Sequence, residues 1–163
     1  MTGDAVTGDA EIVRLCLPHM TRPRDDRWWN YVLTHVGEPD KFKLILDHGV
    51  DPNVRGEGYT ILHHLACPDG AILGLATMLL DAGASLTIRD SLLQSTPLGW
   101  ACRWGRIELV RLYLERGADP VEADAEPWAT PLAWATKRGH HEIIEQLRPG
   151  GAVSGDPQGG WTP

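Results

Sequence analysis

The sequence predicts an all-α solenoid, in which helix-turn-helix units stack side by side and short β-like finger loops join them. Two observations predict this fold class. Glycines that close Leu-rich runs lie 34 residues apart, at Gly49, Gly83 and Gly117. Threonines that start apolar segments recur at intervals of 36 and 34 residues, at Thr60, Thr96 and Thr130. A period of this length indicates stacked units, none of which can bury its apolar face alone.

The third unit, residues 96–120, shows the pattern most completely: TPLGWACRWGRIELVRLYLERGADP. The Thr96 hydroxyl can cap the backbone N–H groups that a helix start leaves unpaired. Pro97 then takes the first helical position, where its missing N–H costs nothing. Gly105 permits a sharp reversal, and Gly117 ends the second helix in a conformation with positive φ. The segment therefore predicts two short helices joined by a tight turn and followed by a corner.

These residues resemble the ankyrin repeat, whose pattern is TPLHxAA, a glycine turn, a Leu-rich helix and a GAD-P-N corner. The helix starts match at TILH, TPLG and TPLA, and the corners match at LILDHGVDP, LLDAGASL and YLERGADP. The resemblance covers about residues 28–152, with a fainter piece before them. It implies an ankyrin-repeat solenoid whose inner helices and finger loops line a concave surface, where such proteins usually bind their partners.

The chain divides into a lead-in, a repeat domain and a tail. Residues 1–22 are expected to be a lead-in with a degenerate capping helix, and 23–152 to be the ankyrin repeat domain. Residues 153–163, which include Trp161, are rich in Gly and Pro, so we expect a flexible tail. Within the domain we expect four units, at residues 23–54, 55–88, 89–122 and 123–152.

The units other than the third are less regular. The first departs from the repeat pattern, since Trp28 and Trp29 stand near the Thr-Pro position, and we expect this pair to fill the end of the solenoid. In the second unit, Pro68-Asp69-Gly70 predicts a longer turn between the helices. The last helix is short and polar, as a cap that faces water should be. The helices expected outside the third unit are residues 8–17, 28–36, 40–48, 60–67, 71–81, 130–138 and 141–147.

Composition and charge argue against several classes of function. The 163 residues suit one domain, and 42% hydrophobic content is ordinary for a soluble globular protein. A formal charge of −7 argues against binding to nucleic acid or to anionic membranes. Cys16, Cys67 and Cys102 form neither a disulfide framework nor a metal-ligand spacing, and Cys102 is expected in the core. Without a signal peptide or an apolar run of membrane-spanning length, we expect a cytoplasmic protein.

Aromatic and basic residues recur at positions that the resemblance places on the concave surface. In the repeat, the fifth, eighth and ninth residues counted from the Thr tend to face this surface. Those positions, with Trp128 toward a finger tip, give the candidate binding residues His64, Trp100, Arg103, Trp104, Trp128, Trp134, Lys137 and Arg138. Trp and Arg dominate binding energy at many interfaces. The alternative is that Trp100 and Trp134, 34 residues apart, stack on each other and serve packing between repeats.

A related pattern in some ankyrin arrays is a cage for methylated lysine, which has Trp at the fifth position of adjacent repeats. Trp100 and Trp134 match two walls of such a cage. However, the eighth position, acidic in that pattern, is Arg103 here, and the residue before Thr96 is Ser95 rather than an aromatic. A cation cage beside a fixed guanidinium is electrostatically poor, so we reject this interpretation. Arg103 suits an anionic or acidic partner instead.

No catalytic constellation is visible, and we expect neither a cofactor nor a metal. The chain has no phosphate-binding glycine loop, no GxSxG and no HExxH. His63 occupies the His of the TPLH motif, where it is expected to hydrogen-bond locally and to tie neighbouring repeats. His63 and His64 are adjacent on one helix and point about 100° apart, so they do not easily share a metal ion with Cys67.

The sequence therefore predicts a non-catalytic protein–protein interaction module that binds an acidic peptide or protein surface. The alternative is a small anionic-ligand binding protein or enzyme that uses the same Trp/Arg/His-lined groove. A third possibility is homo-oligomerisation through exposed aromatics or through the Trp28–Trp29 end, although we expect a monomer.

Overall fold

The computed structural model describes residue 15 and residues 17–19, 25–36, 38–67 and 73–149. The expected helix at 8–17, the turn at 68–70 and Trp161 in the tail lie wholly or largely outside these residues. In chain order, the described elements are η1 (Leu17–His19), α3 (Asp26–His35), α4 (Pro39–Asp47), β1 (Arg55–Gly56), β2 (Tyr59–Thr60), α5 (Ile61–Leu65), α6 (Leu73–Asp81), α7 (Pro97–Arg103), α8 (Ile107–Glu115), α9 (Pro131–Arg138) and α10 (His141–Leu147).

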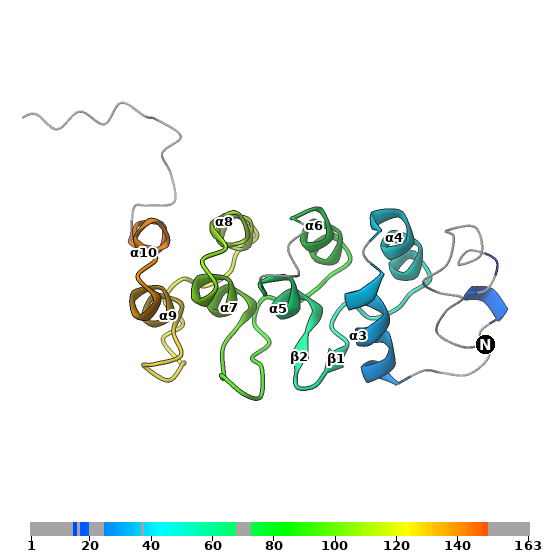
Figure 1. The fold of residues 1–163 in the computed structure, drawn as a ribbon, viewed down its shortest axis with the longest axis horizontal. Helices are drawn as coiled ribbons and strands as arrows, with labels where there is room; N and C mark the ends of the chain where they lie inside the picture. Colours follow the sequence, from blue (N-terminus) through cyan, green and yellow to red (C-terminus); the bar gives the residue numbers. More distant parts are fainter. Residues whose placement is uncertain (1–14, 16, 20–24, 37, 68–72, 150–163) are drawn as a thin grey trace, which may run out of the picture.

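The helices lie in two rows (Figure 1). The inner row holds α3, α5, α7 and α9, the outer row holds α4, α6, α8 and α10, and loops project from the inner row away from the outer one. Along the inner row α7 packs against α5 and α9, and along the outer row α8 packs against α6 and α10. This arrangement confirms the predicted all-α solenoid. α9 and α10 continue the same two rows, while the bounds given to the four units stay predictions.

The predicted helix starts have the local hydrogen bonds that a cap requires. Thr96 Oγ1 accepts from Gly99 N at 3.2 Å, and Thr130 Oγ1 accepts from Ala133 N at 3.1 Å. α3 begins at Asp26 rather than at the expected residue 28, because the carboxylate of Asp25 accepts from the backbone N of Trp28 at 2.9 Å. Side-chain oxygens thus set where these inner helices begin.

Finger loops join each outer helix to the next inner helix. In the first of them β1 and β2 pair antiparallel, with Arg55 opposite Thr60. Asn30 on α3 supports this hairpin, since its Nδ2 donates to the carbonyl of Val54 at 3.0 Å. Gly56 packs so closely on Asn30 that a Cβ there would lie 2.3 Å from the side-chain oxygen.

The core runs along the solenoid between the two rows, and polar bonds tie neighbouring units together. Tyr113 is fully buried, and its hydroxyl donates to the carbonyl of Leu62, 51 residues away, at 3.0 Å. Cys102 is also fully buried, as expected, and burial raises the pKa of its thiol. On the outer row, exposed ion pairs such as Arg116–Asp81, at 2.7 Å, cross between units.

The Trp28–Trp29 pair lies near the N-terminal end of the described solenoid. The two rings meet edge-on with centroids 4.7 Å apart, and both are half-buried against the core. This geometry fits the expected role of filling the end of the stack. Among the described residues, no helix is both long and apolar enough to cross a membrane.

Candidate partner-binding surface

Trp100 lies behind the surface on which the sequence pattern placed it. The side chain is 8% exposed, and its Nε1 donates to the carboxylate of Asp90 at 2.8 Å. Its ring meets the imidazole of His63 edge-on, with centroids 5.5 Å apart. The indole therefore joins the third inner helix to the preceding unit and presents little surface to a partner.

Asp90 is the acceptor around which the second finger loop folds. Its carboxylate accepts from the backbone N of Leu92, Leu93 and Ser95, and from the indole of Trp100, at 2.6–3.0 Å. Burial alone would raise the pKa of this carboxyl, but the donors outweigh burial and hold the pKa below its usual value. The carboxylate of Asp90 therefore has a structural role, because its oxygens already accept from its own loop and from Trp100.

Trp134 is buried as well, with 3% of its surface exposed. Its Nε1 donates to the hydroxyl of Ser95 at 2.8 Å, and that hydroxyl donates onward to the carbonyl of Ala129 at 3.0 Å. The carbonyl of Ser95 accepts from His63 Nε2 at 3.1 Å. Ser95 therefore connects three consecutive units and fixes the position of the Trp134 ring.

His63 has the local structural role that the TPLH motif implies. Its Nδ1 accepts from Thr60 N at 3.2 Å, while its Nε2 donates to Ser95, so both ring nitrogens are used by the neutral tautomer. Burial lowers the pKa of this imidazole to about 4. The ring is fully buried and takes no part in the exposed surface.

Five of the six remaining predicted residues form an exposed surface at the ends of α7 and α9 and in the loop before α9. We call it the basic–aromatic patch and define it as Arg103, Trp104, Trp128, Lys137 and Arg138. Trp104 is 38% and Trp128 52% exposed, and both charged side chains at the end of α9 are exposed. Five of the eight predicted binding residues are therefore exposed or half-exposed near one another.

The buried ring of Trp134 is the platform on which this patch is built. The guanidinium carbon of Arg103 lies 4.5 Å from its centroid, and Lys137 Nζ lies 5.5 Å from it. Trp128 meets the same indole edge-on, at 6.2 Å between centroids. The guanidinium carbon of Arg103 also lies 5.5 Å from the centroid of the Trp104 ring. Cation–π contacts of this kind hold cations in place without neutralising them.

The patch is electropositive although the chain is acidic overall. Within the described residues, Arg103, Lys137 and Arg138 make no ion pair with a carboxylate. Burial first, and the charge of Arg138 second, lower the pKa of Arg103. That second cause indicates that the two guanidiniums lie close enough to repel each other.

His64, the eighth predicted residue, lies apart from the patch. Its partly exposed ring stacks on Tyr59 at 6.3 Å between centroids, and Tyr59 in turn lies 5.5 Å from Trp100. His64 lies on α5, whereas the patch lies at the ends of α7 and α9 and in the loop between α8 and α9. The patch and His64 belong to different stretches of the inner row.

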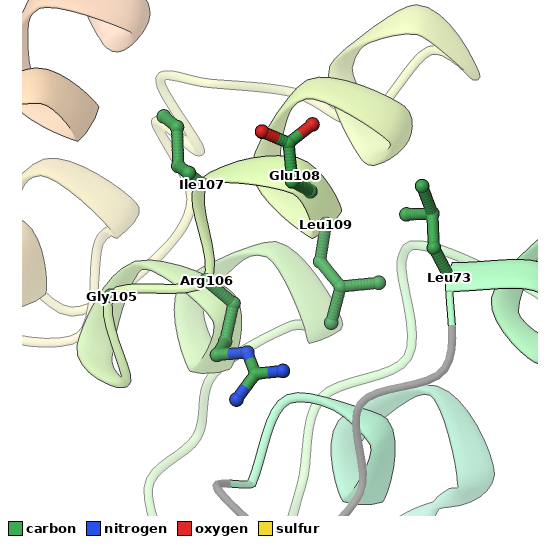
Figure 2. Close-up of a pocket in the computed structure, with 6 residues that line it drawn as sticks. All are labelled: Leu73, Gly105, Arg106, Ile107, Glu108 and Leu109. Atoms are coloured by element: carbon green, nitrogen blue, oxygen red, sulfur yellow. The ribbon is translucent and has the colours of Figure 1, made fainter.

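Two cavities lined by described residues lie elsewhere. The first has a volume of about 310 Å³ and lies between Leu73, at the start of α6, and residues 105–109, around the start of α8. Figure 2 shows that the side chains of Arg106 and Glu108, which line it, point away from each other. The other, of about 130 Å³, lies between two finger loops and is lined mainly by polar side chains. Among the described residues, no three His, Cys, Asp or Glu side chains are grouped to hold a metal ion.

Sequence reasoning missed Asp90, Ser95 and Glu122. Glu122 is buried, accepts from Arg89 Nη1 at 2.8 Å and from the Thr96 hydroxyl, and has a backbone φ of 46°. The signal that could have found these residues is the recurrence of polar side chains a few positions before each Thr start. Asp90 and Glu122 bond to residues within 89–122, whereas Ser95 bonds to residues before and after that range. The sequence period alone does not specify either set of bonds.

The comparisons with known proteins agree with this architecture. A family model described as ankyrin repeats (3 copies) matches residues 30–124, more than half of the chain. No curated protein matches the chain. Ankyrin repeats generally mediate protein–protein interactions. With its repeat period, its two rows of helices and this match, the chain belongs to the ankyrin repeat family.

Proposed function

We propose that this chain is a non-catalytic interaction module that binds an acidic peptide or protein surface through the basic–aromatic patch. The observation that carries the proposal is a pair of cations, Arg103 and Lys137, on one indole, with the charge of Arg138 acting on Arg103; none of the three is paired with a carboxylate in the described part of the chain. Unpaired cations held close together repel one another, and an acidic partner would relieve that repulsion.

The two exposed indoles support the same proposal. Trp104 and Trp128 flank the cations, and each presents a large amphipathic surface to solvent. Binding energy at interfaces is concentrated in Trp, Tyr and Arg side chains. We therefore assign Trp104 and Trp128 the role of apolar anchors and assign the cations the role of selecting an acidic sequence.

The experiment is capture of partners from a lysate of the cells that produce the protein. The test variant is Trp104→Ala with Trp128→Ala, since both side chains are exposed and their loss should leave the fold intact. Tyr31→Ala, on α3, is the matched control, because Tyr31 is also an exposed aromatic but lies far from the patch. The proposal requires a protein that the wild type and the control capture and the double variant does not.

A result in which the double variant captures the same proteins as the wild type, with unchanged circular dichroism and melting temperature, would refute the assignment. The buried pair Trp100 and Trp134 is unsuitable for this test. Each indole donates a buried hydrogen bond, so its removal would destabilise the fold whatever the partner does.

The alternative of a small anionic ligand or an enzyme around His64, Trp100 and Arg103 has less support. Trp100 is buried and its only donor is used by Asp90, and both cavities described above are lined by other residues. The monomeric state and the cytoplasmic location belong to the proposal as well. Sedimentation at two protein concentrations checks the first, and localisation of a tagged chain checks the second.

A further inference from the structure

We propose that the group that docks on the patch is a phosphorylated side chain of the partner rather than a run of carboxylates. The inference rests on the proposed function and names the chemical group that Arg103 selects. Three features of the described residues lead to it: the way Arg103 is held, the number of cations around it and the acidic residues on neighbouring elements.

Arg103 lies against two indoles and keeps its N–H donors for a ligand. The guanidinium lies 4.5 Å from the ring centroid of Trp134 and 5.5 Å from that of Trp104, and its side chain donates to no acceptor in the described structure. A guanidinium has five N–H donors in one plane, in a fork that matches carboxylate and phosphate oxygens. Contact with two rings restricts the guanidinium before a ligand arrives, so less side-chain entropy is lost on binding.

The number of cations favours a dianion. A carboxylate carries one charge and two oxygens, which a single arginine fork can satisfy. A phosphate monoester carries a charge of about −1.5 to −2 and three acceptor oxygens at neutral pH, so it can be shared among several cations. Lys137 lies near the same indole as Arg103, and the charge of Arg138 is felt by Arg103. One phosphate would neutralise most of this cluster, whereas one carboxylate would leave it repulsive.

The surroundings disfavour an extended acidic segment. Exposed carboxylates stand on the elements next to the patch, with Glu108 and Glu142 in the first turns of α8 and α10 and Asp124 in the loop before Trp128. Glu108 and Glu142 share the single cation of Arg111, which leaves a net negative charge there. Screening acts over about 8 Å at physiological salt, so a run of carboxylates would meet this repulsion while a compact dianion would not.

The test compares fluorescent peptide pools with randomised flanks and one fixed central residue: phosphoserine, phosphotyrosine, glutamate or serine. We expect at least one phosphorylated pool to bind the wild-type chain about tenfold or more tightly than the glutamate pool. Arg103→Gln should remove this preference, and Arg103→Lys, which keeps the charge but loses the fork, should weaken it. Arg116→Gln is the matched control, because Arg116 is paired with Asp81 on the outer row and should leave binding unchanged.

A second measurement uses the wild-type chain, so it does not require a variant that folds. Inorganic phosphate, titrated into the labelled protein at constant ionic strength, should shift the indole N–H resonances of Trp104 and Trp134, while acetate should shift them about tenfold less. Arg138→Gln replaces an exposed residue that makes no side-chain hydrogen bond or ion pair within the described residues, and it should weaken phosphopeptide binding without lowering the melting temperature.

The outcomes separate this inference from the proposed function. If the glutamate pool binds as tightly as both phosphorylated pools, the phosphate preference is wrong, although the patch still binds acidic peptides. If no pool binds, the preference is equally wrong, and the capture experiment with Trp104 and Trp128 then decides the proposed function on its own.

Discussion

The Ser95 hydroxyl is the smallest group whose removal should disturb both the fold and the patch. It accepts from the indole of Trp134 at 2.8 Å and donates to the carbonyl of Ala129 at 3.0 Å, with all three groups buried. Ser95→Ala removes only the hydroxyl and keeps the Cβ of residue 95. That Cβ packs close to Gly99, since a Cβ added at Gly99 would lie 3.1 Å from it. A buried donor left unsatisfied costs about 1–3 kcal/mol, and the second lost bond adds about 1 kcal/mol.

We therefore expect Ser95→Ala to lower the free energy of unfolding by about 2–4 kcal/mol, measured by urea denaturation followed by circular dichroism. Ser91→Ala is the matched control, because Ser91 is an exposed serine in the same finger loop, and it should change stability by less than about 0.5 kcal/mol. The reasoning fails if Ser95→Ala costs no more than Ser91→Ala. It also fails if Trp134 fluorescence and peptide binding remain unchanged in a destabilised Ser95→Ala chain.

Two further predictions concern stability. Gly105 has a φ of 70°, and a Cβ there would lie 2.7 Å from the ring of His140, so Gly105→Ala should cost about 1–3 kcal/mol in a urea titration. Gly74→Ala, in α6 with open space around the new Cβ, should cost nothing, and equal losses in the two variants would contradict the explanation. His63 stays neutral in the fold because burial lowers its pKa from 6.5 to about 4. As the pH falls from 6.5 to 4, the unfolded chain binds a proton that the folded chain does not, and stability should decline by up to about 3 kcal/mol. An imidazole titration by NMR that placed the pKa of folded His63 near 6.5 would refute this.

The helix starts and the corners could be predicted because their causes are local. Thr96 and Thr130 each cap the helix that follows by accepting from the backbone N three residues downstream. Gly117 adopts the positive φ of 91° that a helix end followed by a corner requires. The sequence records these requirements within a few positions of where they act. The repeat period then predicts the order of stacking without any knowledge of long-range contacts.

The burial of Trp100 and Trp134 could not be predicted in the same way. A fifth-position indole can point outward or back into the stack, and the choice depends on where its N–H finds an acceptor. The acceptors are Asp90, ten residues earlier, and Ser95, thirty-nine residues from Trp134. The repeat pattern does not specify which of these side chains accepts an indole N–H. The residues at the ends of α7 and α9 are exposed or half-exposed, and their role in binding stays a prediction.

The central claim is that a partner binds at the basic–aromatic patch, and site-specific photo-crosslinking tests it most directly. A photoreactive p-benzoylphenylalanine replaces Trp104 in one chain and Tyr31 in another, and both chains are irradiated in a lysate of the cells that produce the protein. The account predicts that position 104 gives a crosslinked partner that position 31 does not give. It also predicts that this crosslink disappears when an excess of a phosphopeptide that the chain binds is added. Crosslinking of one partner from position 31 alone would place the binding surface elsewhere and contradict the account.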